Sequence, residues 1–143
     1  MPAFEVAISI CLSWIAAKSI TLISNSIRAK KLSFETLVMD GGFASAHSAA
    51  VTALAVATAF ETGFSPLFVF TGLFALIIMN DAMHVRHYVG EHSRILNKMI
   101  TKEKLSYALQ EERCGHTMWQ VITGFFVALI VTIICFKLIF PVI

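Results

Sequence analysis

Charged residues are scarce in this sequence. Only 14% of its 143 residues are Asp, Glu, Lys or Arg, whereas 57% are hydrophobic. A soluble protein with buried helices is disfavoured, because too little polar surface remains to cover helices this apolar. The chain is short enough for one domain, so we expect a single membrane-embedded domain over residues 1–143.

Cysteine pairs and processing signals are also lacking. The three cysteines are odd in number, and their spacing matches neither a disulfide framework nor a zinc site. The first apolar segment has no basic start and no A-x-A-like cleavage site, so a signal peptide is not expected. We expect no metal, no cofactor and no nucleic-acid partner.

Four apolar stretches are present instead. Each approaches the ~20 residues that a helix needs to cross a bilayer core. They cover approximately Ala3–Ile23, Ala44–Phe60, Pro66–Met83 and Trp119–Ile143. The second stretch is rich in alanine at small-residue spacings, which favours close helix contacts inside a bundle. The predicted fold is therefore all-α: a polytopic bundle of about four transmembrane helices.

The basic residues are unevenly distributed between the segments that flank these spans. With four spans, only Lys137 lies towards the side of the termini. The other side carries Arg28, Lys30, Lys31, Arg86, Arg94, Lys98, Lys102, Lys104 and Arg113. The positive-inside rule makes that side cytoplasmic. We expect a multi-pass protein of a bacterial-type cytoplasmic membrane, although basic residues that serve in a site would bias this count.

A polar segment, Val89–Cys114, separates the last two spans and is too charged to cross a membrane. Apolar residues recur in it at roughly helical intervals, namely Ile95, Leu96, Met99, Ile100, Leu105 and Leu109. Two interpretations are equally supported: one or two amphipathic helices at the cytoplasmic membrane surface, or a mobile polar loop. In either form the segment could cover a site at the helix ends.

Two helix starts carry a glycine and a histidine. The string GGFASAHSA at 41–49 places Ser45 and His47 at the mouth of the second span, and GHTMWQVITG at 115–124 places His116 at the mouth of the fourth. A glycine turn before a helix N-terminus presents backbone N–H groups that suit a phosphate. Histidine can exchange a proton near neutral pH. We therefore predict one phosphate site that contains both histidines.

Further ionisable residues fall on the same side by position alone. Lys18 lies near the end of the first span with Arg28 after it, and Asp81 and Arg86 close the third span. A ring of cations could be ordinary positive-inside charge. An acidic and a basic residue at a span end are harder to explain without a partner or a function.

Three blocks together resemble the divergent, membrane-embedded branch of the type-2 phosphatidic acid phosphatase superfamily, which is related to acid phosphatases and vanadium haloperoxidases. They are GGFASAHSAAVTALA, NDAMHVRHYVGEHSRILN and GHTMWQVITG. The branch patterns are GGMPSSHSA, then D-A-x-x-V-R-x-x-x-G-x-x-x-x-x-L-N, then G-H-x-x-x-E-V-x-x-G. Their order and spacing cover most of the chain from Gly41 to Gly124, and the set is specific although each block alone would be weak.

The resemblance implies roles for individual residues. His116 matches the histidine that attacks phosphorus and becomes phosphohistidine, and His47 matches the one that protonates the leaving alcohol. Arg86 would bind the phosphate. The remaining phosphate-binding candidates are Ser45, which would donate a hydrogen bond, the backbone at Gly42 and Ala46, and the cations Lys18 and Arg28, whose spacing matches the first family motif poorly.

The sequence departs from the family pattern most at Gln120, which stands where the branch has a glutamate four residues after the nucleophile. A carboxylate there would support the imidazolium, whereas an amide oxygen can accept the same bond without a full charge. Turnover could be slow, Asp81 or Glu112 could substitute, or catalysis could be lost. Two functions therefore stay open: a phosphatase acting on a phosphorylated membrane lipid, and a non-catalytic protein that binds such a lipid or an anion. A homo-oligomer also stays open.

Overall fold

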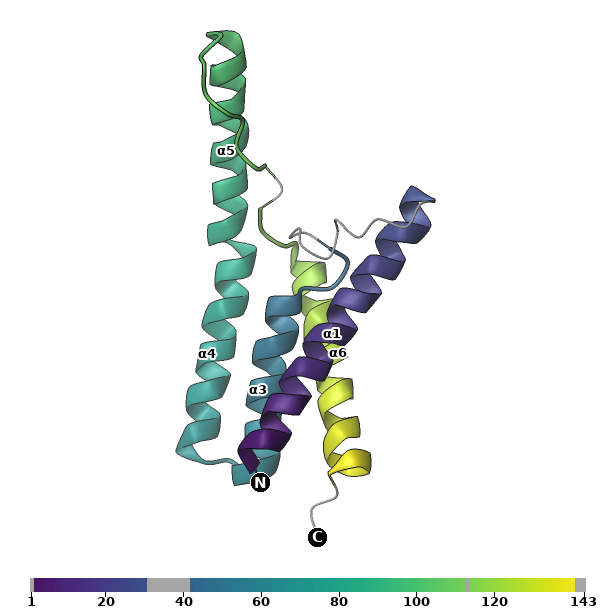
Figure 1. The fold of residues 1–143 in the computed structure, drawn as a ribbon. Coiled ribbons are helices and arrows are strands. Elements are labelled where there is room, and N and C mark those ends of the chain that lie inside the picture. Colours follow the sequence, from purple (N-terminus) through teal and green to yellow (C-terminus); the bar gives the residue numbers. More distant parts are fainter. Residues whose placement is uncertain (1, 31–41, 113, 141–143) are drawn as a thin grey trace.

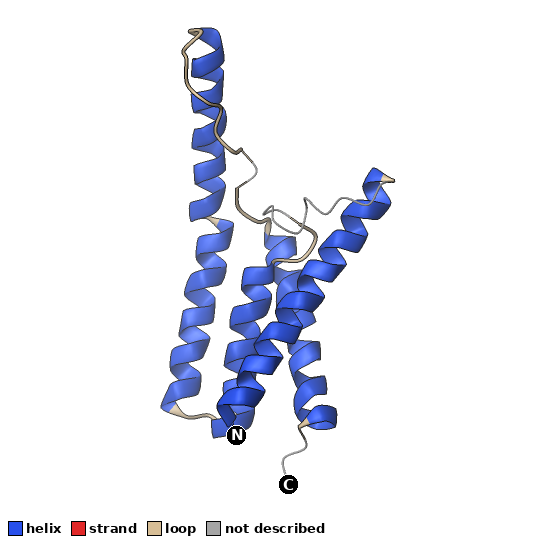
Figure 2. Ribbon diagram, in the orientation of Figure 1, coloured by secondary structure: helices blue, strands red, loops and turns tan. Residues whose placement is uncertain are grey.

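The computed structural model describes residues 2–30, 42–112 and 114–140, and all secondary structure in these ranges is helical. Figures 1 and 2 show helices packed side by side in a bundle, with a further helix that extends beyond it. In chain order the elements are α1 (Pro2–Ala29), α3 (Ala46–Thr62), α4 (Pro66–Met83), α5 (Val85–Lys102), α6 (Met118–Ile134) and the π-helix η1 (Cys135–Ile139). The predicted all-α polytopic bundle is confirmed.

Three helical stretches are long and apolar enough to cross a membrane among the described residues. They are Ala3–Ile27, Pro66–Lys102 and Met118–Ile139. The fourth expected span is α3, which has only 17 residues. It lies inside the bundle, in contact with α1, α4 and α6. The shortest of the four expected spans is therefore the one surrounded by other helices of the protein.

The core of the bundle consists of small side chains. Ala46, Ala49 and Ala53 of α3 pack with Ala17 of α1 and Ala128 of α6, and all five are buried. The inner face of α1 continues this pattern at every fourth residue with Ser9, Ser13, Ala17 and Thr21. Small residues let helix backbones approach closely. In a membrane, where the lipid is as apolar as the side chains, helices associate through such close packing and not through the hydrophobic effect.

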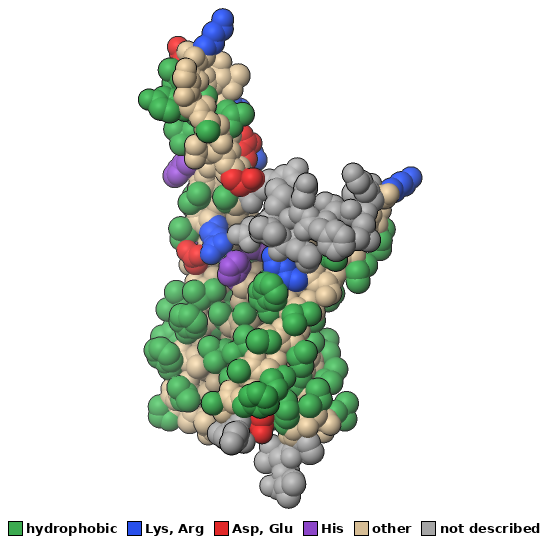
Figure 3. All heavy atoms as spheres, viewed as in Figure 1, with side chains coloured by type: hydrophobic (Ala, Val, Ile, Leu, Met, Phe, Trp, Pro, Cys, Tyr) green, Lys and Arg blue, Asp and Glu red, His purple; other side chains and the backbone are tan. Residues whose placement is uncertain are grey.

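Large apolar side chains lie on the outside of the bundle. On α4, for example, Leu67, Phe70, Leu73 and Ile77 are exposed, whereas Ala75 and Ala82 are buried. Figure 3 shows this apolar surface as a belt, with most of the charged side chains and histidines in view gathered beyond one end of it. This arrangement is typical of a protein whose solvent over most of its surface is lipid.

The segment between the last two spans begins as a single amphipathic helix, α5. It follows α4 after one residue, His84, and continues in nearly the same direction (Figure 1). Residues 105–112 are not helical and run back along α5 towards the bundle. The structure thus has one helix here, not two, and the helix points away from the bundle end instead of lying across it.

Candidate functional site

The two glycine–histidine segments lie at the same end of the bundle, opposite the start of α1 (Figure 1). They are joined by a backbone hydrogen bond, in which the N–H of Ser45 donates to the carbonyl oxygen of Gln120 at 2.9 Å. Behind this bond, a Cβ on Gly124 would lie 2.3 Å from the carbonyl oxygen of Ser45, so only glycine allows the contact. A close backbone approach therefore holds the two helix starts together.

Ser45 is the N-cap of α3. Its Oγ accepts a hydrogen bond from the backbone N–H of Ser48 at 3.3 Å, and the residue is fully buried. This is the ordinary role of serine at a helix start. The predicted phosphate-binding serine therefore caps the helix. Ala46, the next residue, is the first residue of α3.

Thr21 of α1 fixes the turn that precedes α3, a role that sequence reasoning missed. Its Oγ1 lies 3.2 Å from both the backbone N and the carbonyl oxygen of Ala44. A Cβ on Gly42 would lie 1.9 Å from Cγ2 of Thr21, so this glycine is required by close packing. The signal that could have revealed Thr21 is the small-residue spacing of residues 9, 13, 17 and 21 on α1.

His116 is held by its backbone before α6 begins. Its N–H donates to the carbonyl oxygen of Ala82 on α4 at 3.0 Å. Gly115 has φ +88° and packs so tightly on the backbone of Arg86 and His87 that a Cβ would lie 2.6 Å from the nitrogen of His87. The left-handed conformation and the close contact both require glycine here. The glycine of the second Gly-His pair thus anchors the histidine to the α4–α5 junction.

The structure brings the two predicted catalytic histidines together. The ring centroids of His47 and His116 are 6.1 Å apart, with the ring planes at 78°. His116 is 7% exposed, and Nδ1 of each ring is enclosed within the protein. Two imidazoles at this separation can both reach one small group that sits between the helix starts.

Arg86 and Asp81 form an ion pair at the end of α4. Arg86 Nε lies 3.5 Å from Asp81 Oδ2, and both side chains are over one-third exposed. An exposed pair of this kind contributes at most about 1 kcal/mol to stability. Asp81 directly precedes Ala82, whose carbonyl oxygen accepts the N–H of His116, and the backbone of Arg86 lies against Gly115. The predicted phosphate-binding arginine therefore lies in the same region as His116.

The positions of Lys18 and Arg28, the candidate cations of the first family motif, are described less completely. Lys18 is partly buried, with Nζ 5.8 Å from the ring centroid of Trp14. Its neighbour Ala17 packs against Ala44 and Ala46, so Lys18 lies at the level of the α3 start. Arg28 lies in the last turn of α1, and its side chain is outside the described residues, as is Lys31.

Gln120 caps α6, a contact that sequence reasoning did not foresee. Its Oε1 accepts the backbone N–H of Thr117 at 2.8 Å, while Oγ1 of Thr117 accepts the N–H of Gln120 at 3.3 Å. This is a reciprocal capping box, in which glutamate serves as well as glutamine. The residue therefore has a structural reason to be an acid or an amide, apart from any contact with His116.

A cavity of about 430 Å³ borders the two helix starts. Its lining is mixed, with aromatic, amide and hydroxyl groups from α1, the turn before α3 and the first turns of α6. The lining residues are Asn25, Gly42, Phe43, Thr117, Trp119, Gln120 and Thr123. Among the described residues, no group of three His, Cys, Asp or Glu side chains is arranged to hold a metal ion.

These features define a multi-pass helical membrane protein with two histidines paired at adjacent helix starts. The profile of the Divergent PAP2 family matches residues 4–131, and the chain belongs to that family. The match covers all four packed helices and the α5 segment, so the resemblance of the three sequence blocks is confirmed at the level of the family.

One similar protein is the uncharacterized membrane protein YuiD of Bacillus subtilis (strain 168). It is 43% identical over 75 residues, which are 52% of this chain and 48% of YuiD. The alignment thus spans about half the length of that relative. No solved structure is similar enough to count as a match.

Proposed function

We propose that this protein is a membrane lipid-phosphate phosphatase that hydrolyses a phosphomonoester through a phosphohistidine intermediate. The observation that carries the proposal is the 6.1 Å separation of the His47 and His116 rings at two joined helix starts. Membership of the Divergent PAP2 family supports it. The substrate class is a phosphorylated membrane lipid such as a polyprenyl phosphate or a phosphatidate, because the two histidines lie at the end of an apolar bundle.

In the proposed first step His116 attacks phosphorus. Because Nδ1 of His116 is enclosed, Nε2 is the attacking atom. The N–P bond forms as the P–O bond to the lipid alcohol breaks, and His47 transfers a proton to the leaving oxygen. Arg86, Lys18 and the backbone N–H groups at the α3 start would stabilise the charge on the phosphoryl oxygens.

The proposed second step releases phosphate. Water attacks the phosphohistidine, His47 accepts the proton from that water, and the N–P bond breaks. The products are inorganic phosphate and the free lipid alcohol, and both histidines return to their starting protonation states. One residue thus acts as acid and then as base, which requires a pKa not far from the working pH.

A second candidate function is non-catalytic binding of a phosphorylated lipid or anion. Gln120 is the observation that favours it, since a glutamine four residues after His116 brings no full negative charge to support an imidazolium. The capping contact to Thr117 is compatible with either function, because glutamate and glutamine can both make it.

The decisive experiment measures phosphate release from lipid monoesters by the purified protein. We expect His116→Ala to abolish release. We expect Gln120→Glu to raise it about tenfold or more, since ~1.4 kcal/mol of transition-state stabilisation suffices for a factor of ten. Glutamate preserves the capping box, so this variant should fold as the parent does.

Each outcome selects a function. Wild-type turnover in His116→Ala would contradict the nucleophile assignment. If neither the parent nor Gln120→Glu releases phosphate, yet both bind the lipid monoester, the binding function replaces the phosphatase. Both variants are first shown to insert in the membrane and to elute as the parent does on size exclusion.

A further inference from the structure

The polar face of α5 is buried and its apolar face is exposed, which is the reverse of a helix packed on a protein core. Its buried residues are Gly90, Ser93 and Asn97, which face the returning chain of residues 105–112 and the bundle end. Its opposite face is apolar and about half exposed, and comprises Val85, Tyr88, Val89, Ile95, Leu96 and Met99. His92 is also exposed and lies within this face. A helix face with this many exposed apolar side chains, the apolar stripe of α5, is suited to an apolar environment.

The polar face is firmly occupied by the returning chain. Asn97 Nδ2 donates to the carbonyl oxygen of Gln110 at 2.9 Å and to Oε1 of Glu112 at 2.7 Å, while its Oδ1 accepts the N–H of Gln110 at 2.8 Å. A Cβ on Gly90 would lie 2.9 Å from the carbonyl oxygen of Glu112. α5 and the returning chain therefore form one unit, and the apolar stripe cannot turn inward without breaking it.

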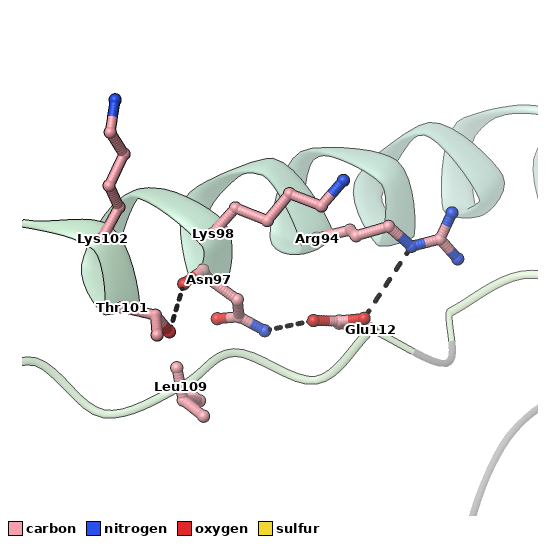
Figure 4. Close-up of a pocket in the computed structure, with 7 residues that line it drawn as sticks. All are labelled: Arg94, Asn97, Lys98, Thr101, Lys102, Leu109 and Glu112. Carbon is pink, nitrogen blue, oxygen red and sulfur yellow. Dashed lines mark hydrogen bonds and ion pairs between the residues drawn. The ribbon is translucent and has the colours of Figure 1, made fainter.

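A row of basic residues borders the apolar stripe. Arg94, Lys98 and Lys102 recur at every fourth position, so they lie on one side of α5. They line a groove of about 560 Å³ (Figure 4). Arg94 is paired with Glu91 at 2.8 Å and with Glu112 at 3.8 Å.

Within this row, Lys98 and Lys102 are the cations best placed to meet an outside anion. Lys98 makes no ion pair with any residue that the structure describes, and Lys102 reaches Glu103 only at 4.0 Å. In Figure 4 Lys102 extends away from the returning chain and Lys98 runs along α5 towards Arg94, whereas Asn97 and Thr101 face the returning chain. Neither lysine side chain is directed at the returning chain.

We propose that α5 docks on an anionic lipid surface, with its apolar stripe in the interface and with Lys98 and Lys102 on lipid phosphates. Apolar residues flanked by Lys and Arg are the pattern of helices that bind such surfaces. α4 also exposes Phe70, Phe74 and Ile77, which the polar residues 80, 81 and 84 separate from the apolar stripe of α5.

Docking requires a bend between α4 and α5. The two helices are nearly collinear, and α4 alone is about 27 Å long, close to the ~30 Å thickness of the hydrocarbon core. A straight pair would hold the apolar stripe of α5 in water. His84 is the single residue between the helices, and no side chain caps the start of α5 there, so the bend is placed at His84.

The test places an environment-sensitive fluorescent amino acid at Leu96 in the full chain, reconstituted in nanodiscs. One set contains equal parts of phosphatidylglycerol and phosphatidylcholine, and the other contains phosphatidylcholine alone. We expect blue-shifted emission and quenching by chain-brominated lipid in the anionic nanodiscs, and weaker quenching in the neutral ones. Two control positions carry the same probe. At Leu76 on α4 it gives the emission expected inside the membrane, and at Ala108 on the returning chain it gives the emission expected in water.

Charge variants provide the matched controls. Lys98→Gln with Lys102→Gln should reduce the docked-to-undocked ratio roughly 25-fold, because about fivefold per basic residue corresponds to ~1 kcal/mol each near an anionic surface. Lys98→Arg with Lys102→Arg should preserve docking. Equal quenching at Leu96 in both lipid mixtures, or none in either, overturns the proposal. Blue-shifted emission without bromine quenching, together with crosslinking between copies, would assign the stripe to a second copy instead.

Discussion

At the scale of the residue, the smallest side chains decide the geometry of the histidine site. Gly42 lies against Thr21, Gly115 against the backbone of Arg86, and Gly124 against the backbone of Ser45. Because glycine has no side chain, each of these positions lets two segments of the chain approach closely. The separation of His47 and His116 therefore depends on residues that have no side chain to take part in the chemistry.

Gly124→Ala tests this dependence. The added Cβ would lie 2.3 Å from the carbonyl oxygen of Ser45, so α6 must move away from the start of α3. We expect a loss of about 1–3 kcal/mol, the usual cost of overpacking, and a lower thermal midpoint in detergent. Gly72→Ala on α4 is the control, because nothing lies within 4 Å of its added Cβ. An equal midpoint shift in both variants would show that the close contact does not matter.

At the scale of the element, the two helix starts use different caps. Ser45 caps α3 with its side chain, and Thr117 and Gln120 cap α6 reciprocally. The caps supply hydrogen bonds to backbone N–H groups that a helix start leaves without internal partners. Thr117 directly follows His116. The cap of α6 therefore also fixes the position of the backbone next to His116.

Thr117→Ala should weaken the start of α6. We expect a loss of about 1 kcal/mol, typical of an N-cap threonine replaced by alanine, and Thr117→Ser should retain most of that stability. Thermal unfolding in detergent measures both. Hydrogen exchange should quicken at the first turn of α6 in the alanine variant only. Unchanged exchange there would mean that the bond between Ser45 and Gln120 holds the turn by itself.

The long apolar stretches, the alanine-rich inner helix and the family blocks could be read from the sequence because each is a local pattern. Periodicity also revealed Ile95, Leu96 and Met99 as apolar residues of a helix, α5, whereas Leu105 and Leu109 of the same pattern lie beyond its end. The direction of α5 and the fold of residues 105–112 could not be predicted, since they depend on Asn97 binding Gln110 and Glu112 across 13 and 15 residues. The capping role of Gln120 was not predicted, although the spacing of Thr117 and Gln120 matches the capping-box pattern.

At the scale of the whole molecule, the bundle has two chemically different ends. The histidine site, the ion pair of Arg86 with Asp81 and the projecting α5 unit lie at one end, and the start of α1 and the end of η1 lie at the other (Figure 1). The basic residues gather almost entirely at the first end. The positive-inside rule therefore predicts that this end faces the cytoplasm and that both termini lie outside.

Cysteine labelling in intact cells tests this orientation. Thr101→Cys places a thiol on α5 at the predicted inner end, and Phe64→Cys places one in the exposed turn between α3 and α4 at the predicted outer end. Both are made in a background with Cys11→Ser and Cys114→Ser, because Cys11 is exposed and Cys114 is partly exposed. An impermeant maleimide added outside should label position 64 and spare position 101 until the cells are opened. The reverse pattern would place the histidine site outside, where a lipid phosphate of the outer leaflet would be its substrate and the basic residues of α5 would serve binding instead of topology.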